Sequence, residues 1–521
     1  MCKMKACLLY LVAALVVAAC TDLATTVEDA IGEDVSEGST PPIADPTAAL
    51  IGVYNQLREL RGVTKTFALM EHPSDEMMGP TRGTDWSDFG VWRQLHAHTW
   101  DPSHGQVLDT WNDLNAGIFR ATQVVDAPTS TARQVAEARF LRAFFAFYVM
   151  DMFGQVPFRP SDAAPSAIPT VMNRAEAFDF IVQDLRAARP LLPNLTSGAD
   201  AATASQEAVD FLLARLYLNR AVYTTSTPAS PSAGPYTFAP ADMDSVIARV
   251  QAIIDNPYTD LTAFWDNFHW DNTTRSKELV FVKAEAAGTG GNFTTFWWTL
   301  HYNQTGCCNG FVTLGAFYDL FETADVRRTA YIPGMTDSTG VWAGILEGQQ
   351  YKTYTDPNTP GDSLFDRGGN PLNFTREVDL LYSNERMGLR VIKYPFNPAQ
   401  RDEPGTDFIF FRYADALLMK AEAHFRKGET GTAMTIVNQI RTTDPNNRGA
   451  SLLTSITEQD LLDERGRELY WEGWRRHDQV RFGVFTQAWE QKPASGAHRV
   501  MFPIPQRALD TNPNLVQIQG Y

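Results

Sequence analysis

Cysteine is scarce in this sequence, and short catalytic motifs are missing. Five of the 521 residues are cysteine, and no two of them have the CxxC spacing of a zinc site. There is no nucleophile elbow, no HExxH pair and no Walker loop, which are the usual signatures of serine hydrolases, zinc proteases and nucleotide-binding enzymes. No catalytic residue, metal site or cofactor is therefore predicted, and the protein is not expected to be an enzyme.

Basic residues are also few. The 44 Lys and Arg are outnumbered by 61 Asp and Glu, which gives a formal net charge of −17. The phosphate backbone of a nucleic acid would repel such a chain, and there is no Lys- or Arg-rich arm to bind it. No nucleic-acid partner is therefore expected.

Two groups of possible metal ligands are too incomplete to predict a metal site. His96, His98 and His104 are close in the sequence, but no cysteine or further ligand completes a metal set, so surface or hydrogen-bonding roles are predicted for them. Residues 356–362 partly imitate a calcium loop, but Arg367 stands where the loop needs a bidentate Glu.

The amino terminus has the pattern of an export signal. Residues 1–19 combine two lysines with an apolar run that is too short to cross a bilayer, which is typical of a signal peptide. Small residues then precede Cys20, as in the lipobox of bacterial lipoproteins, so lipidation of Cys20 is predicted. The alternative is an ordinary signal peptide with a chance cysteine. Residues 20–45 are polar and acidic, which suits a lipidated tether.

The stretch EARFLRAFFAFYVMDMFGQVP, residues 137–157, is the strongest helical signal. Apolar residues follow one another at steps of four, three and four from Leu141 to Met152, and phenylalanines form a second stripe beside them. Gly154 ends the helix, and the proline at 157 cannot continue it. A helix that is apolar on most of its circumference must be buried on several sides. The predicted fold is therefore mainly α, with tetratricopeptide-like helix pairs.

Apolar residues with the spacing of a helix also occur in two groups of segments, one before and one after the middle section of the chain. Other helices are predicted at 46–61, 108–125, 175–192, 206–223, 243–254, 411–426, 431–441, 457–473 and 475–484. Between the two groups lie short strand-like runs such as 279–283 and 389–394, separated by Gly, Pro and Asn clusters. The predicted organisation is a helical core of residues 46–255 and 408–521, packed with an irregular, loop-rich lobe of residues 256–407.

Aromatic residues gather in stretches that lack helical period, above all in the long loop predicted between Glu71 and Trp100. Sugar rings present apolar C–H faces edged by hydroxyls, so a glycan site needs flat aromatic platforms with carboxylate, amide or Arg groups beside them. The predicted ligand-binding residues are Asp85, Trp86, Trp92, Arg93, Trp297, Trp298, Tyr302 and Asn303, and a further aromatic stretch holds Trp265 and Trp270. The alternative is that these aromatics fill the core of the lobe. Trp86 is the strongest candidate, because no helical stripe would bury it.

For three regularly spaced glutamates and for a pair of adjacent cysteines, the sequence allows more than one interpretation. Glu464, Glu468 and Glu472 are spaced by four residues and offer the carboxylate pair of a glycoside hydrolase, but four arginines in the same segment favour a structural ion-pair network. The adjacent Cys307 and Cys308 can form a strained vicinal disulfide, stay reduced or pair between molecules.

Several stretches together resemble the SusD/RagB family of outer-membrane nutrient-binding lipoproteins. They are the lipobox at Cys20, EARFLRAFFAFYVMDMFGQVP, FRYADALLMKAEA, ERGRELYWEGWRRHDQVRFG and the closing FPIPQRALDTNPNLVQIQGY. PTRGTDWSDFG and LHYN further suggest the branch nearest the starch-binding members. The resemblance implies a fold of helix pairs plus an irregular lobe, a lipid anchor in the outer membrane, exposure at the cell surface, and association with a SusC-like TonB-dependent transporter.

The function that this resemblance implies is capture of an oligo- or polysaccharide and its delivery to that transporter. The alternatives are a peptide-binding, RagB-like member and, further off, a glycoside hydrolase. Aromatic loops favour a glycan over a peptide as the ligand.

Overall fold

The computed structural model describes residues 42–286, 298–304, 308–401, 405–442 and 448–521. Residues 162–166 belong to a small separate unit. Every element described below belongs to the larger unit, residues 42–161 and 167–521.

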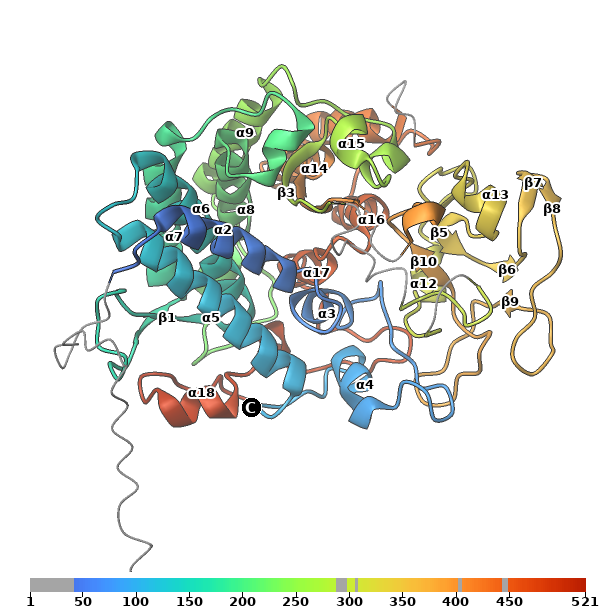
Figure 1. Cartoon of the computed structure of the whole chain (residues 1–521), viewed down its shortest axis with the longest axis horizontal. Coiled ribbons are helices and arrows are strands. Elements are labelled where there is room, and N and C mark those ends of the chain that lie inside the picture. Colours follow the sequence, from blue (N-terminus) through green and yellow to red (C-terminus); the bar gives the residue numbers. More distant parts are fainter. Residues whose placement is uncertain (1–41, 287–297, 305–307, 402–404, 443–447) are drawn as a thin grey trace, which may run out of the picture. The chain divides into compact units, whose positions relative to one another are not determined.

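The central aromatic stretch forms α6, which is the core of the helical part. α6 spans Ala132–Phe153, begins with a capping box at Thr131 and ends at Gly154, whose φ is 71°. All residues from Phe140 to Phe153 are buried, because α5 (Gly105–Asp126) and α7 (Arg174–Ala188) pack on this helix (Figure 1). The predicted helix and its burial on several sides are confirmed.

Helices that follow each other in the chain pack in pairs. α8 (Gln206–Thr225) packs on α9 (Pro240–Ile254), and α14 (Tyr413–Arg426) packs on α15 (Thr430–Thr442). α14 also contacts α9, so helices more than 150 residues apart in the sequence pack together. Further helices are α2 (Pro46–Gln56), α3 (Thr66–Glu71), α4 (Val91–His96), α10 (Asn272–Arg275), α12 (Gly315–Tyr318), α13 (Met335–Thr339), α16 (Glu458–Leu469), α17 (Arg475–Arg481) and α18 (Gln506–Thr511). The mainly α fold is confirmed, whereas the tetratricopeptide-like form of the pairs stays a prediction.

The strands are short and antiparallel. β3 (Leu279–Lys283) pairs with β11 (Phe408–Arg412), and Phe144 of α6 meets rings from both strands. A three-stranded sheet contains β10 (Arg390–Ile392), β5 (Ala343–Leu346) and β4 (Thr329–Ala330). The two-stranded pairs are β1 (Gln155–Phe158) with β2 (Thr170–Asn173), β6 (Gly348–Gln349) with β9 (Asn373–Phe374), and β7 (Tyr354–Asp356) with β8 (Thr359–Pro360).

Residues between β3 and β11 have a hydrophobic cluster of their own. Its buried members run from Leu300 to Phe396, whereas the larger cluster combines residues of the helices with β3, β11 and other residues between these strands, such as Phe311 and Val391. The boundaries predicted for the lobe stay a prediction.

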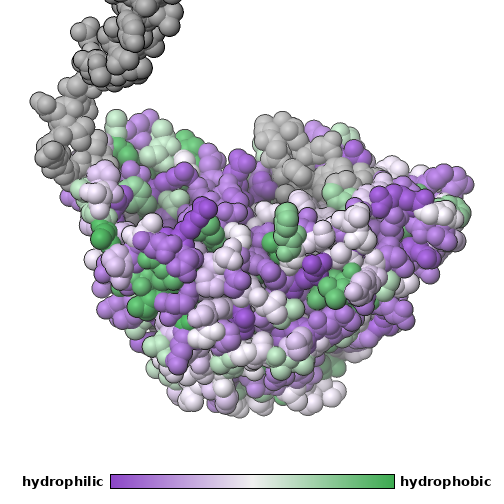
Figure 2. Space-filling model, turned by 90° about the horizontal axis from the view of Figure 1, so that it is seen from below, coloured by the Kyte–Doolittle hydropathy of each residue, from purple (hydrophilic) through white to green (hydrophobic). Residues whose placement is uncertain are grey.

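The visible surface of the protein carries both hydrophilic and hydrophobic residues (Figure 2). On the face shown in Figure 2, hydrophobic residues form small patches among hydrophilic ones. Within the described ranges, no helix is both long enough and apolar enough to cross a membrane.

Candidate functional site

The loop predicted at 71–100 contains more local structure than the sequence suggests. A 3-10 turn covers Asp88–Gly90, and α4 follows it directly. An element of six residues is too short to display a helical period, so the sequence gives no signal for it. Three residues other than glycine, in or beside the turn, have positive φ angles, namely Trp86 (62°), Asp88 (31°) and Phe89 (54°). Such a conformation is costly in residues other than glycine and persists where the surroundings hold it.

A cleft of about 710 Å³ opens beside this loop. The residues that line it are Thr84, Asp85, Trp86, Asp88, Val91, Trp92, Gln106, Trp298, Tyr302 and Cys308. Segments far apart in the sequence therefore bring three indole rings, two carboxylates and a phenol to one space. Its volume falls within the range of about 300 to 1,000 Å³ that is usual for small-molecule sites.

Trp86 is held in place at the wall of the cleft. Its Nε1 donates a hydrogen bond of 2.5 Å to the carbonyl oxygen of Cys308, and its ring centroid lies 5.2 Å from that of Trp298. The backbone at Gly310 passes so close that a Cβ atom there would lie 2.2 Å from Cζ2 of Trp86. Trp86 is half-buried and packs against the core, so it is not the free loop residue that the sequence predicts, although part of it still lines the cleft.

Trp298 and Trp92 extend the aromatic cluster. Trp298 stacks on Phe311 with ring centroids 5.8 Å apart and an interplanar angle of 12°. Trp92 is only 3 % exposed, and its Nε1 donates to Oδ2 of Asp88 at 2.7 Å. His72 packs against Trp92 and Phe311, and burial lowers the pKa of His72 to about 3, so this ring is neutral. Trp92 thus supports the wall of the cleft and offers little open surface.

Asp85 forms the polar edge of the cleft. Its Oδ2 accepts hydrogen bonds from the Tyr302 hydroxyl at 2.6 Å and from Nη2 of Arg367 at 3.1 Å. The Tyr302 hydroxyl, followed by Arg367, lowers the pKa of Asp85, which keeps the carboxylate ionised at neutral pH. Arg367 also lies 4.0 Å from the centroid of the Tyr302 ring, so one face of that ring is already covered.

Two predicted residues, Arg93 and Asn303, do not line the cleft. Arg93 donates to Oγ1 of Thr81, and the exposed Asn303 donates to the Phe365 carbonyl at 2.7 Å. Trp297 lies outside the described residues.

The other aromatic stretch packs elsewhere. Trp265 and Trp270 pack against the hydrophobic cluster of the loop-rich part, and Nε1 of Trp265 donates to the Val326 carbonyl at 2.8 Å. Five lining residues of the cleft are not among the predicted ligand-binding residues, namely Thr84, Asp88, Val91, Gln106 and Cys308. Except for Asp88, which lies in the same predicted loop as Trp86, their side chains are uncharged and not aromatic, so only the folded structure identifies them.

The histidines take the hydrogen-bonding roles predicted for them. Ring nitrogens of His96, His98 and His104 each lie within 3.2 Å of a backbone carbonyl oxygen. The described part of the chain holds no group of three or more His, Cys, Asp or Glu that could bind a metal ion. Cys308 is disulfide-bonded, and every other cysteine, including Cys307, lies outside the described residues.

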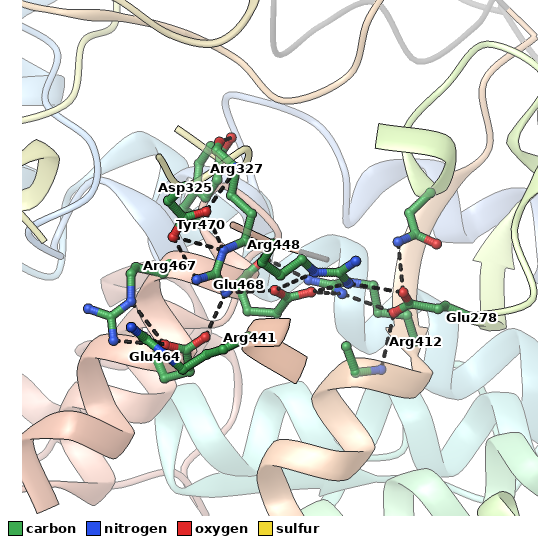
Figure 3. A network of polar contacts seen from close by, with 12 residues as sticks. Glu278, Asp325, Arg327, Arg412, Arg441, Arg448, Glu464, Arg467, Glu468 and Tyr470 are labelled. Atoms are coloured by element: carbon green, nitrogen blue, oxygen red, sulfur yellow. Dashed lines mark hydrogen bonds and ion pairs between the residues drawn. The ribbon is translucent and has the colours of Figure 1, made fainter. Parts of the chain in front are cut away.

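Glu464, Glu468 and Glu472 take part in an ion-pair network, as predicted. Figure 3 shows the part of it around Glu464 and Glu468. The ion pairs of Glu468 are with Arg327 at 2.9 Å, Arg412 at 2.8 Å and Arg448 at 3.0 Å. Burial would raise the pKa of Glu464, but the guanidinium groups around it outweigh burial and lower the pKa to about 2. The general acid of a glycosidase needs a raised pKa and access to the sugar, whereas Glu464 and Glu468 are buried and have a lowered pKa.

The partners in this network differ from those that the sequence predicts. Four arginines, at positions 465, 467, 475 and 476, lie in the same segment as the three glutamates. Only Arg467 pairs with one of these glutamates. The others pair elsewhere, Arg465 with Asp415 and Asp478, Arg475 with Asp75, and Arg476 with Asp151. Residues next to each other in a helix point to different sides, so sequence proximity does not identify ion pairs.

The comparisons with known proteins agree with this fold. Residues 277–521 match a family model described as the SusD family, and residues 60–218 match one described as starch-binding associating with outer membrane. The chain is 27 % identical over 495 residues to the starch-binding protein SusD of Bacteroides thetaiotaomicron, which covers 88 % of this chain and 85 % of that protein. It is 33 % identical over 456 residues to the SusD-like protein P38 of Formosa agariphila, covering 79 % of each. Among solved structures, a laminarin binding SusD-like protein matches with a TM-score of 0.66 and 20 % identity, over 92 % of this chain and 100 % of that chain.

Proposed function

The chain belongs to the SusD family, and from this premise we propose that it is a surface-exposed lipoprotein that captures a glycan and delivers it to a SusC-like TonB-dependent outer-membrane transporter. The observation that carries the proposal is the cleft lined by three tryptophans and two carboxylates. Aromatic faces suit the apolar faces of sugar rings, and carboxylate oxygens accept hydrogen bonds from their hydroxyls. The relatives named as starch-binding and laminarin binding support a glycan over a peptide. Binding without catalysis is part of the proposal.

Replacing Trp86 with alanine tests the cleft. We expect the Kd for a bound oligosaccharide to rise about ten-fold, because one stacking platform is worth on the order of 1 to 2 kcal/mol. Calorimetric titration of the soluble mature chain with laminarihexaose and maltohexaose measures the change, and the bound sugar should be recovered intact. Trp270→Ala is the matched control, since Trp270 does not line the cleft. If the Trp86 variant is folded and binds as tightly as the wild type, the cleft is not the glycan site.

The charge of the cleft predicts which glycans it prefers. Asp85 is paired with Arg367, and no Lys or Arg is among the described residues that line the cleft, so Asp88 leaves this lining acidic. A neutral oligosaccharide should bind about five- to ten-fold more tightly than its sulfated derivative at low salt, from a repulsion of about 1 kcal/mol. Asp88→Asn should reduce this preference, because an amide oxygen still accepts from Trp92 but carries no charge. Equal affinities of the wild type for the two ligands would contradict the prediction.

The anchor is tested separately at Cys20. Because the acyl chains alone hold the protein at the membrane in this proposal, Cys20→Ser should move the folded protein from the membrane fraction to the soluble fraction. Cys7→Ser, in the predicted signal peptide, is the matched control and should stay with the membrane. A Cys20→Ser protein that remains in the pellet after a high-salt wash would rule out lipidation as its anchor.

A further inference from the structure

A second pocket, of about 250 Å³, lies in the loop-rich part of the chain. Six of its nine lining residues lie between Trp342 and Gln350, in or beside β5 and β6, and Tyr354 of β7 completes one side. None of its lining residues belongs to the larger cleft. The two are nevertheless close in the fold, because Gln304, two residues after Tyr302 of the cleft, donates at 3.4 Å to Gln350 of the pocket.

Two aromatic rings form a corner in this pocket. The ring centroids of Trp342 and Tyr354 are 5.5 Å apart, and their planes meet at 77°. Tyr331 packs 5.4 Å from Trp342, and Tyr351 packs 5.7 Å from Tyr354, so both walls are supported from outside the pocket. Trp342 and Tyr354 are each half-buried, which leaves part of each ring open.

Polar groups stand at the edge of the corner in fixed orientations. The Tyr318 hydroxyl donates to Oε2 of Glu347 at 2.6 Å, and Arg328 lies 4.2 Å from the centroid of the Tyr318 ring. Nε2 of Gln349 donates to the Leu364 carbonyl at 3.0 Å, which orients its amide. Among the described residues, nothing donates to Oε1 of Glu347 or to Oε1 of Gln349. Both residues line the pocket, and these two oxygens are free to accept hydrogen bonds from hydroxyl groups.

We propose that this pocket is a second glycan-binding site, which holds a short part of a neutral sugar chain against Trp342 and Tyr354. The proposal rests on the proposed function, since it assumes that the ligand of this protein is a glycan. The pocket offers the same kinds of groups as the larger cleft. Its aromatic walls suit the C–H faces of a sugar ring, and its oriented acceptors suit the hydroxyls of that ring. The smaller volume limits the occupant to fewer rings.

Fluorine NMR of protein that contains 5-fluorotryptophan tests this site and the cleft independently. The chain has 12 tryptophans, and single Trp→Phe variants assign the resonances of Trp342, Trp86 and Trp298. Laminarihexaose, maltohexaose and cellohexaose are the probes. We expect the Trp342 resonance to shift with at least one probe, and to shift equally in Trp86→Ala. In Glu347→Ala, which keeps the indole but removes an acceptor, the same shift should need several-fold more ligand.

Each outcome decides between the two sites. If Trp86 and Trp298 respond but Trp342 responds to no probe, the second site is wrong and the proposed function stands. If Trp342 responds only while Trp86 is intact, its signal reports on the cleft, and the second site is also wrong. If Trp342 responds and the cleft tryptophans do not, the second site stands and the cleft is not the glycan site. If no tryptophan responds, both proposals fail.

Discussion

Gly310→Ala is expected to weaken glycan binding about ten-fold or more, as much as removal of the Trp86 ring itself. The added Cβ would lie 2.2 Å from Cζ2 and 2.5 Å from Cε2 of Trp86, far inside the distance at which carbon atoms pack. Gly310 is not among the glycines with positive φ, so alanine fits its backbone, and the three atoms nearest to the added Cβ all belong to the indole of Trp86. Trp86 must then leave the wall of the cleft and lose its hydrogen bond to the Cys308 carbonyl.

A double variant separates this mechanism from general damage to the fold. Once Trp86 is alanine, the Cβ at position 310 meets no indole, so Gly310→Ala should add little to the effect of Trp86→Ala. Gly52→Ala is the matched control, because a Cβ at position 52 of α2 meets nothing within 4 Å. Calorimetric titration gives the affinities, and thermal melts show that each variant is folded. Wild-type affinity in Gly310→Ala would mean that the position of Trp86 does not matter for binding.

The long helices could be predicted from the sequence because their own residues specify them. α6 has its apolar stripes, its cap at Thr131 and its stop at Gly154 within one continuous stretch. α3 and α4 have six residues each, which is too few for a period, and their burial depends on segments that fold against them. The pairing of β3 with β11 likewise depends on the path of the chain between them, and neither strand specifies its partner.

The composition of the cleft could be predicted, but its arrangement could not. Trp86 and Asp85 stand out because a loop rich in Gly and Asp has no other reason to carry an indole beside a carboxylate. That Trp298 and Tyr302 join them depends on long-range contacts. Arg367 shows the limit most clearly. In the sequence it only breaks a calcium-loop pattern, whereas in the structure it pairs with Asp85 and covers a face of Tyr302.

Glu468→Gln is expected to destabilise the protein by about 3 to 5 kcal/mol, which is the usual cost of breaking a buried ion pair by removing one partner. The carboxylate is fully buried and is shared by three guanidinium groups, which come from the loop-rich part, from β11 and from the segment before α16 (Figure 3). Glutamine keeps the shape of the side chain but leaves these cations with one negative charge fewer. The free energy of unfolding, measured by urea denaturation with circular dichroism, reports the loss.

Glu458→Gln provides the matched control on the same helix. The Glu458 side chain is 54 % exposed and pairs with Arg426 at 3.2 Å, and such surface pairs contribute about 1 kcal/mol or less. The same substitution in α16 should therefore have a small effect at position 458 and a large one at position 468. Similar effects at the two positions would contradict a structural role for the network. If instead Glu468→Gln kept its stability but abolished a glycan-cleaving activity of the wild type, the carboxylate would be catalytic, and the proposal of binding without catalysis would fail with it.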